Sequence, residues 1–128
     1  MTIQLNHTIV PARDGAVSAR WFADLFGMAE PTRFGHFWQV STANGVDLDF
    51  DTYGENDGTF TAQHYAFLVD EDEFDSIFAR IRERGIEFWA DPGRSRACEI
   101  NHHDGGRGVY FQNADGHLLE IITRPYGG

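Results

Sequence analysis

Apolar residues recur along the chain with two different periods, and the period predicts which element each segment forms. Alternating or branched apolar residues predict strands. Apolar residues that recur every three to four positions predict helices. The expected strands are 3–10, 35–41, 46–52, 63–70, 86–90, 107–112 and 117–124, and the expected helices are 14–27 and 71–85.

The ends of the two expected helices are marked by residues that stop or start a helix. Asp14 is a good N-cap for the first helix, which should end at Gly27, and the second should end at Gly85. Two short glycine turns, "TANG" and "NADG", each separate a pair of expected strands. Such turns predict hairpins.

This order of elements occurs twice. Each half runs strand, helix, shorter strand and hairpin, and a turn glycine precedes an acidic residue by four positions in both halves: Gly45 before Asp49, and Gly116 before Glu120. A β-α-β-β-β unit has an apolar sheet face that it cannot cover alone, so two copies should pack into one α+β domain. The expected boundaries are 1–128 for the domain, about 1–53 and about 61–126 for the two modules, and about 54–60 for a polar linker.

One carboxylate interrupts the last apolar strand. In "HLLEIITR", alternation places Glu120 on the same face as Leu118 and Ile122. A buried carboxylate costs several kcal/mol unless something pairs with it. An arginine or a metal ion are the two partners that the composition offers.

Four candidate ligands lie at matching places in the repeat. The first strands hold His7 and His64, and the last strands hold Asp49 and Glu120. Two imidazoles and one or two carboxylates on rigid strands form a typical ligand set for a divalent metal, and they leave coordination positions open. Taken singly, the histidines are more typical of core or edge positions and the aspartates of "VDLDFDT" of a solvated face. Their coincidence in the repeat favours the metal hypothesis.

Composition narrows the partners. The 128 residues carry 20 acidic and 10 basic side chains, a net charge of −10, which disfavours nucleic acids and anionic membranes. A single cysteine, Cys98, excludes an internal disulfide, and neither a signal peptide nor an apolar run of about 20 residues is visible. We therefore expect a cytoplasmic protein that does not span a membrane.

The whole chain resembles the vicinal oxygen chelate superfamily, which includes glyoxalase I, extradiol dioxygenases, fosfomycin-resistance proteins and bleomycin-resistance proteins. The resemblance rests on "LNHTIV" and "QHYAFLVD", each ahead of a helix, and on "YFQNADGHLLEI". It implies two βαβββ modules that form a curved, open-barrel sheet around a metal. The implied ligands are His7, His64 and Glu120, with Asp49 as a fourth ligand or a base.

One stretch is similar to the pattern of extradiol ring-cleavage dioxygenases. In "NHHDGGRGVYFQNADGHLLE", His103 and Tyr110 match residues that line the site in that family and hydrogen-bond the substrate and oxygen, although Ala114 stands where the family has proline. Extradiol enzymes also carry an acid–base histidine in the neighbourhood where this chain offers Asp49. The chain is about half their usual length. Alternatively, His103 is a polar loop tip and Tyr110 a core residue.

The sequence thus predicts a metal-dependent enzyme that acts on a small oxygen-bearing substrate, with dioxygenase-like chemistry at Fe(II) favoured and Zn, Ni or Mn as other candidates. A glyoxalase I-like lyase or isomerase is the second expectation, and a non-catalytic bleomycin-type binding protein is the third. Fosfomycin transfer ranks lower, because no cationic substrate pocket is evident. We also expect a homodimer, since short units leave sheet edges that need a partner.

Overall fold

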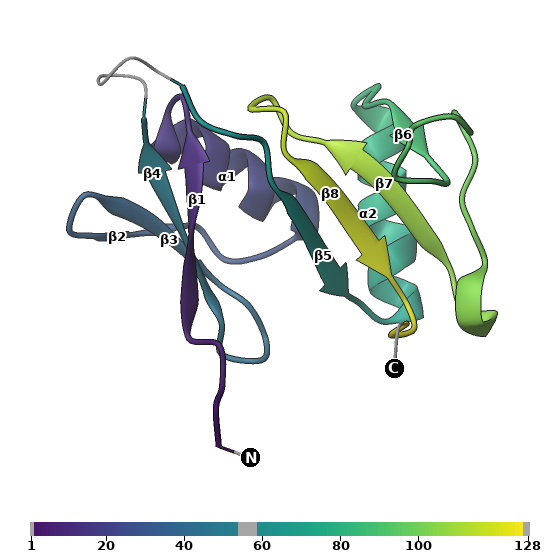
Figure 1. The fold of residues 1–128 in the computed structure, drawn as a ribbon, viewed down its shortest axis with the longest axis horizontal. Helices are drawn as coiled ribbons and strands as arrows, with labels where there is room; N and C mark the ends of the chain where they lie inside the picture. The colour runs from purple at the N-terminus through teal and green to yellow at the C-terminus, as the bar shows by residue number, and fades with distance from the viewer. Residues whose placement is uncertain (1, 54–58, 127–128) are drawn as a thin grey trace. The chain divides into compact units, whose positions relative to one another are not determined.

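The computed structural model describes residues 2–53 and 59–126. The chain divides into two compact units, Met1–Thr61 and Ala62–Gly128, each with one four-stranded sheet and one long helix (Figure 1). This confirms the predicted α+β class. The linker predicted at about 54–60 falls largely on residues 54–58, which lie outside the described residues.

The first unit has the strand order β1-β4-β3-β2. Strand β1 runs parallel to β4, and the remaining pairs are antiparallel. Helix α1 packs against β3 and β4. Its elements are β1 (His7–Ala12), α1 (Gly15–Phe26), β2 (Thr32–Phe34), β3 (Phe37–Ser41) and β4 (Asp47–Thr52).

The second unit repeats this topology with the order β5-β8-β7-β6. Again the first strand pairs in parallel with the last, and the other pairs are antiparallel. Its elements are β5 (His64–Leu68), α2 (Glu71–Glu83), β6 (Phe88–Trp89), the 3₁₀ turn η2 (His103–Gly105), β7 (Gly108–Gln112) and β8 (Leu118–Ile122). The identical strand order in both units confirms the repeat predicted from the sequence.

Each sheet buries one face beneath its own helix. In the second unit, Phe111 and Ile121 are fully buried with Phe74 and Ile81 of α2. In the first unit, Phe50 of β4 meets Phe22 of α1, with ring centroids 5.8 Å apart. Because side chains alternate along a strand, the opposite faces carry the candidate ligands.

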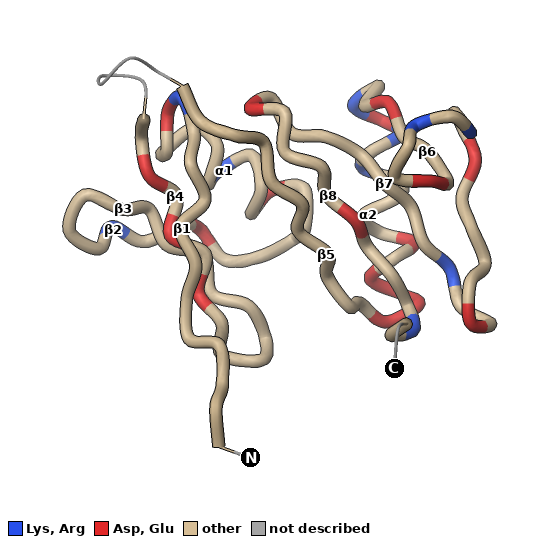
Figure 2. The backbone as a smooth tube through the Cα atoms, viewed as in Figure 1, with Lys and Arg blue, Asp and Glu red and all other residues tan. Residues whose placement is uncertain are grey.

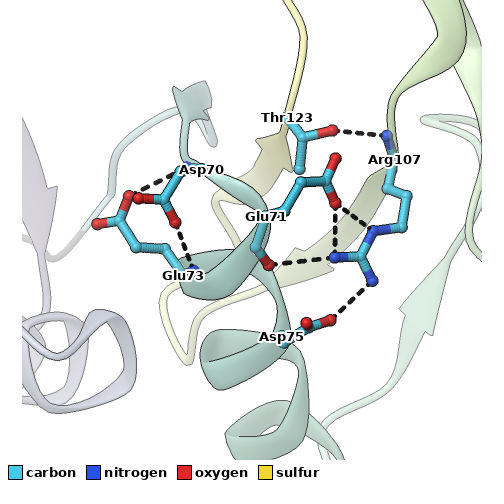
Figure 3. Close-up of polar contacts among 6 residues, drawn as sticks. All are labelled: Asp70, Glu71, Glu73, Asp75, Arg107 and Thr123. Atoms are coloured by element: carbon cyan, nitrogen blue, oxygen red, sulfur yellow. Dashed lines mark hydrogen bonds and ion pairs between the residues drawn. The ribbon is translucent and has the colours of Figure 1, made fainter.

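The helix ends follow the predicted chemistry. The Asp14 side chain accepts a hydrogen bond from the Val17 backbone, and Gly27 closes α1 at φ 70°. At α2, Asp70 and Glu73 form a capping box, in which each side chain accepts from the other's backbone N–H (Figure 3). Gly85 follows α2 at φ 65°, a backbone conformation that suits glycine.

Arg107 joins the start of β7 to the first turn of α2 (Figure 3). Its guanidinium donates to Glu71 Oε2 and to Asp75 Oδ1, both at 2.8 Å, and lies 4.3 Å from the centroid of the Phe74 ring. Hydrogen bonds to Thr123 and Arg107 hold the pKa of Glu71 below its usual value. Arg107 therefore ties the start of β7 to helix α2.

Three strand boundaries differ from the sequence prediction. The first strand begins at His7 instead of residue 3, because its parallel partner starts opposite His7, and Ile3 and Leu5 remain exposed. The strand expected at 35–41 begins at Phe37, because residues 35–36 form the turn that joins it to the unpredicted strand β2. The strand expected at 86–90 shortens to two residues.

No helix within residues 2–53 and 59–126 is long and apolar enough to cross a membrane.

Candidate metal centre

Strand register gathers three side chains on the face of the second sheet that lies opposite α2. Glu120 pairs with Ala66 of β5 and with Tyr110 of β7, and His64 lies two residues before Ala66. Paired residues on neighbouring strands point to the same side of a sheet, so His64, Tyr110 and Glu120 share one face. Tyr110, and not its neighbour Phe111, therefore shares the face of Glu120.

His64 and Glu120, the two candidate ligands of the second unit, lie against each other. Nε2 of His64 lies 3.2 Å from Oε1 of Glu120, whose side chain is 1% exposed. The other ring nitrogen, Nδ1, lies 2.9 Å from the Leu118 carbonyl, which can only accept, so Nδ1 carries the proton in the neutral ring. Nε2 and the carboxylate oxygen then both present lone pairs to each other. A cation bound between the two atoms would accept both lone pairs.

Two tyrosine hydroxyls complete the surroundings of Glu120. The Tyr126 hydroxyl donates to Oε1 at 2.9 Å and to Oε2 at 3.2 Å. Burial raises the pKa of the Tyr110 hydroxyl, and hydrogen bonds to Tyr126 and Glu120 raise it further. The hydrogen bond with Tyr110 lowers the pKa of Tyr126, but desolvation and the bond to Glu120 outweigh it. Both phenols therefore keep their protons and act as donors.

The first unit offers a parallel arrangement around His7 and Asp49. Ile9 pairs with Asp49 and His7 with Asp47, so both candidates lie on one face of that sheet. Asp49 is 5% exposed and accepts a hydrogen bond from Gln39 Nε2 at 2.9 Å. The solvated-face interpretation is therefore wrong for Asp49, although β4 does carry a row of acidic residues (Figure 2).

His7 resembles His64 in how its ring is held. Its Nδ1 lies 2.7 Å from Asn6 Oδ1, which leaves Nε2 as the lone-pair nitrogen of the neutral ring. Histidines that bind metals usually donate their other N–H to an oxygen in this way, which fixes the tautomer and the ring orientation. Both histidines thus present the nitrogen that a metal needs.

The donors of the second unit fit one divalent ion in spacing as well as in chemistry. Two donors about 2.1 Å from a common ion lie about 3.0 to 3.4 Å apart for angles between octahedral and tetrahedral. The observed separation of Nε2 and Oε1 is 3.2 Å. Within each unit, the described residues contain no group of three or more His, Cys, Asp or Glu that could hold a metal.

His103 is held less firmly than the other candidates. It lies exposed in the turn η2, where its backbone N–H donates to Asn101 Oδ1 at 3.3 Å. Asn101 is itself buried and bridges to Gly108, the first residue of β7. The loop is thus anchored next to the strand of Tyr110, and a role for the His103 ring stays a prediction.

Sequence reasoning missed Tyr126 and Gln39. Tyr126 lies beyond the last periodic segment, in coil, where neither alternation nor a motif marks it. Gln39 lies on an expected strand opposite Asp49, and a register inferred from the "TANG" hairpin could have found it.

Comparison with known proteins places this geometry in a family. The model of the Glyoxalase/Bleomycin resistance protein/Dioxygenase superfamily matches residues 4–121. The Metallothiol transferase FosB of Shouchella clausii (strain KSM-K16) is 38% identical over 122 residues, covering 93% of this chain and 79% of that protein. The Glutathione transferase FosA of Serratia marcescens is 26% identical over 129 residues, covering 94% of this chain and 81% of that protein.

Among solved structures, Oxidase ChaP-H1 is 57% identical, with a TM-score of 0.94 over 99% of this chain and 100% of that chain. A lactoylglutathione lyase from Agrobacterium tumefaciens has a TM-score of 0.68 over 95% of this chain and 93% of that chain. Its identity is only 17%, so it shows a shared fold and does not favour lyase chemistry.

Proposed function

Because the chain belongs to the Glyoxalase/Bleomycin resistance protein/Dioxygenase superfamily, we propose that it is a metal-dependent enzyme that oxidises a small substrate with adjacent oxygen atoms. The observation that carries the proposal is the buried Glu120 carboxylate, whose Oε1 faces Nε2 of His64 at 3.2 Å. The 57% identity to Oxidase ChaP-H1 over 99% of the chain supports oxidation as the reaction class.

The proposed ligands are His64 and Glu120 of the second unit and His7 of the first. Two histidines and one carboxylate suit Fe(II) and leave positions for substrate and oxygen, so Fe(II) is favoured over Zn, Ni or Mn. When bound, the ion would polarise the substrate oxygens and, as Fe(II), supply the redox chemistry with O₂. Asp49 would act as a fourth ligand or as a base that accepts a substrate proton.

Tyr110 and His103 would act on the substrate rather than on the ion. The Tyr110 hydroxyl lies on the same face as His64, with its ring stacked 5.9 Å from the imidazole centroid. A phenol that keeps its proton can donate to a substrate oxygen on which negative charge develops. His103 would donate or accept a proton at the edge of the same site, from the loop that precedes β7.

The test begins with protein purified without chelators or nickel resin, followed by metal analysis and reconstitution with Fe(II) under anaerobic conditions. We expect oxygen uptake with a panel of catechols, measured with an oxygen electrode. His64→Ala and Glu120→Gln should abolish uptake, whereas Cys98→Ser, at an exposed residue, should not. Thiohemiacetal isomerisation without oxygen uptake would overturn oxidation in favour of the lyase-like reading.

A second candidate is metal-dependent thiol transfer, which the 38% identity to Metallothiol transferase FosB favours. Two arginines around the long loop are already paired with carboxylates, which weakens the case for an anionic substrate there: Arg107 is paired with Glu71 and Asp75, and Arg96 lies 3.6 Å from Glu99. Loss of free thiol from cysteine or glutathione in the presence of fosfomycin and Mn(II) would favour this function over oxidation. Both candidates are catalytic, so they favour an enzyme over an antibiotic-sequestering protein.

A further inference from the structure

A tyrosine from the end of the described chain lies on the Glu120 carboxylate. The Tyr126 hydroxyl contacts both oxygens, at 2.9 Å to Oε1 and 3.2 Å to Oε2. The nearer oxygen, Oε1, is the one that faces His64. Hydroxyl and imidazole thus meet at the same oxygen from two different segments of the second unit.

The chain reaches this position by bending after β8. The Thr123 backbone N–H donates to the Arg107 carbonyl, and the Thr123 hydroxyl accepts from the Arg107 backbone, so the bend is tied to the start of β7. Gly106 leaves room for it, because a Cβ there would lie 2.7 Å from Thr123 Oγ1 and 2.9 Å from Arg124 Cγ. Tyr126 then returns towards the strand that it has just left.

We propose that Tyr126 is a positioning residue of the metal centre, whose hydroxyl holds the Glu120 carboxylate with Oε1 turned towards His64. The inference rests on the proposed function, since it concerns the same ligand pair. A glutamate carboxylate otherwise rotates broadly about its last torsion. A single donor shared by both oxygens restricts that rotation and leaves their remaining lone pairs available to an ion.

Tyr126 differs in kind from the ligands. It comes from an irregular segment rather than from a strand, and its side chain is 48% exposed. The loss of a partner that orients a ligand typically weakens metal affinity by 10–100-fold. The hydroxyl alone should account for this effect, because the phenyl ring of a phenylalanine would still cover the carboxylate.

The test compares Mn(II) affinity, measured by electron paramagnetic resonance, for the wild type, Tyr126→Phe and Tyr65→Phe. Tyr65 makes a matched control: it lies in the same unit, on the opposite face of the sheet, where its ring meets His117 edge-on. We expect the Kd of Tyr126→Phe to rise about 10–100-fold and that of Tyr65→Phe to stay within about twofold. Circular dichroism and the unfolding midpoint should show that both variants fold.

The outcomes separate this inference from the proposed function. Absence of Mn(II) binding to the wild type, together with absence of Fe(II) from protein reconstituted anaerobically, would overturn both. Wild-type affinity in Tyr126→Phe would overturn only the positioning role. Tighter binding by Tyr126→Phe would also overturn it, since the hydroxyl would then compete with the ion for the carboxylate.

A remote variant tests the same inference without touching the site. Gly106→Ala should displace the bend at Thr123 and Arg124, and so weaken Mn(II) binding in the wild-type background. In the Tyr126→Phe background it should have no further effect, because the contact is already lost. Additive losses in the double variant would show that Gly106 acts by another route and would contradict the proposed placement of Tyr126.

Discussion

At Glu120 a charged group is kept at 1% exposure among side chains from three segments of the chain. His64 approaches from β5, Tyr110 from β7 and Tyr126 from beyond β8. A carboxylate buried without partners would cost several kcal/mol, so removal of any one partner should destabilise the charged form of Glu120. The groups that offset this cost of burial are the same groups that serve the proposed metal centre.

The part of this arrangement that the sequence predicts is the part that lies on strands. Alternation in "HLLEIITR" places Glu120 on one face of its strand, and the resemblance to extradiol enzymes marks Tyr110 as a residue of the site. The strand register brings both to the same face. Tyr126 lies in coil, where no period constrains a side chain, so its contact could not be predicted. The direction of the His64 ring depends on the Leu118 carbonyl, which only the parallel register reveals.

Tyr110→Phe tests the role of the hydroxyl next to Glu120. We expect turnover of a verified substrate to fall about 10–1000-fold at saturating metal, because one hydrogen bond to the transition state is lost. The fold and the metal content should be unchanged, since the ring remains in place. Unchanged kcat in a steady-state assay would contradict the dioxygenase-like role of Tyr110.

His117 supports a second prediction at the residue scale. The residue is completely buried, and its Nδ1 accepts the Gln63 backbone N–H at 2.9 Å, next to the start of β5. His117→Leu would leave that N–H without its acceptor and should lower the free energy of unfolding by about 1–3 kcal/mol in urea titrations. His117→Asn offers an amide oxygen near the position of Nδ1 and should lose less. Equal losses in the two variants would show that ring volume, rather than the acceptor, matters.

At the scale of elements, helices were predicted more closely than strands. The bounds of α1 and α2 follow from their own caps and end glycines, which are local signals. Strand ends depend on a partner: residues 3–6 alternate like a strand but have no parallel neighbour beyond Asp47 in β4. Strand β2 is exposed along its length and has no apolar pattern that would have identified it.

The capping box of α2 gives a prediction at this scale. Asp70→Ala removes the acceptor for the Glu73 backbone N–H and should lower the free energy of unfolding by about 1 kcal/mol. Asp72→Ala, two residues further along, keeps the box and serves as the control for removing a charge from the first turn. Urea denaturation of the metal-free protein measures both. A loss in Asp72→Ala as large as that in Asp70→Ala would assign the effect to charge alone.

At the scale of the whole molecule, the repeat is what the sequence reveals best. The two sheets share one strand order, and the long loop before β7 is an addition that leaves this order unchanged. Each unit covers one face of its sheet with its own helix, so the periodicity within a unit does not predict how the other unit packs. A metal centre shared by His7 of the first unit and Glu120 of the second therefore stays a proposal.

We predict that the protein is a homodimer. Strands β1 and β2 flank the first sheet and β5 and β6 the second. The outer edge of β6 is bridged to Ala97, whereas β1, β2 and β5 each have one strand neighbour in the described parts of the chain. Phe34 on β2 is 62% exposed and Leu68 on β5 is 61% exposed. Open edges with exposed apolar residues favour association. Sedimentation velocity at micromolar concentration should show about twice the chain mass of 14.5 kDa, and a species of 14.5 kDa alone would contradict the prediction.

If the modules are also exchanged between chains, His7 of one chain would complete the site of the other. His7→Ala and His64→Ala chains, each inactive alone, should then regain activity when unfolded together and refolded as a mixture. In a mixed dimer of this kind, one site carries both substitutions and the other carries none, so random pairing should restore about a quarter of the wild-type sites. A site formed within each chain would retain a substitution in every copy, and the mixture would stay inactive. Recovery of oxygen uptake after refolding, scored against each variant refolded alone, distinguishes the two arrangements.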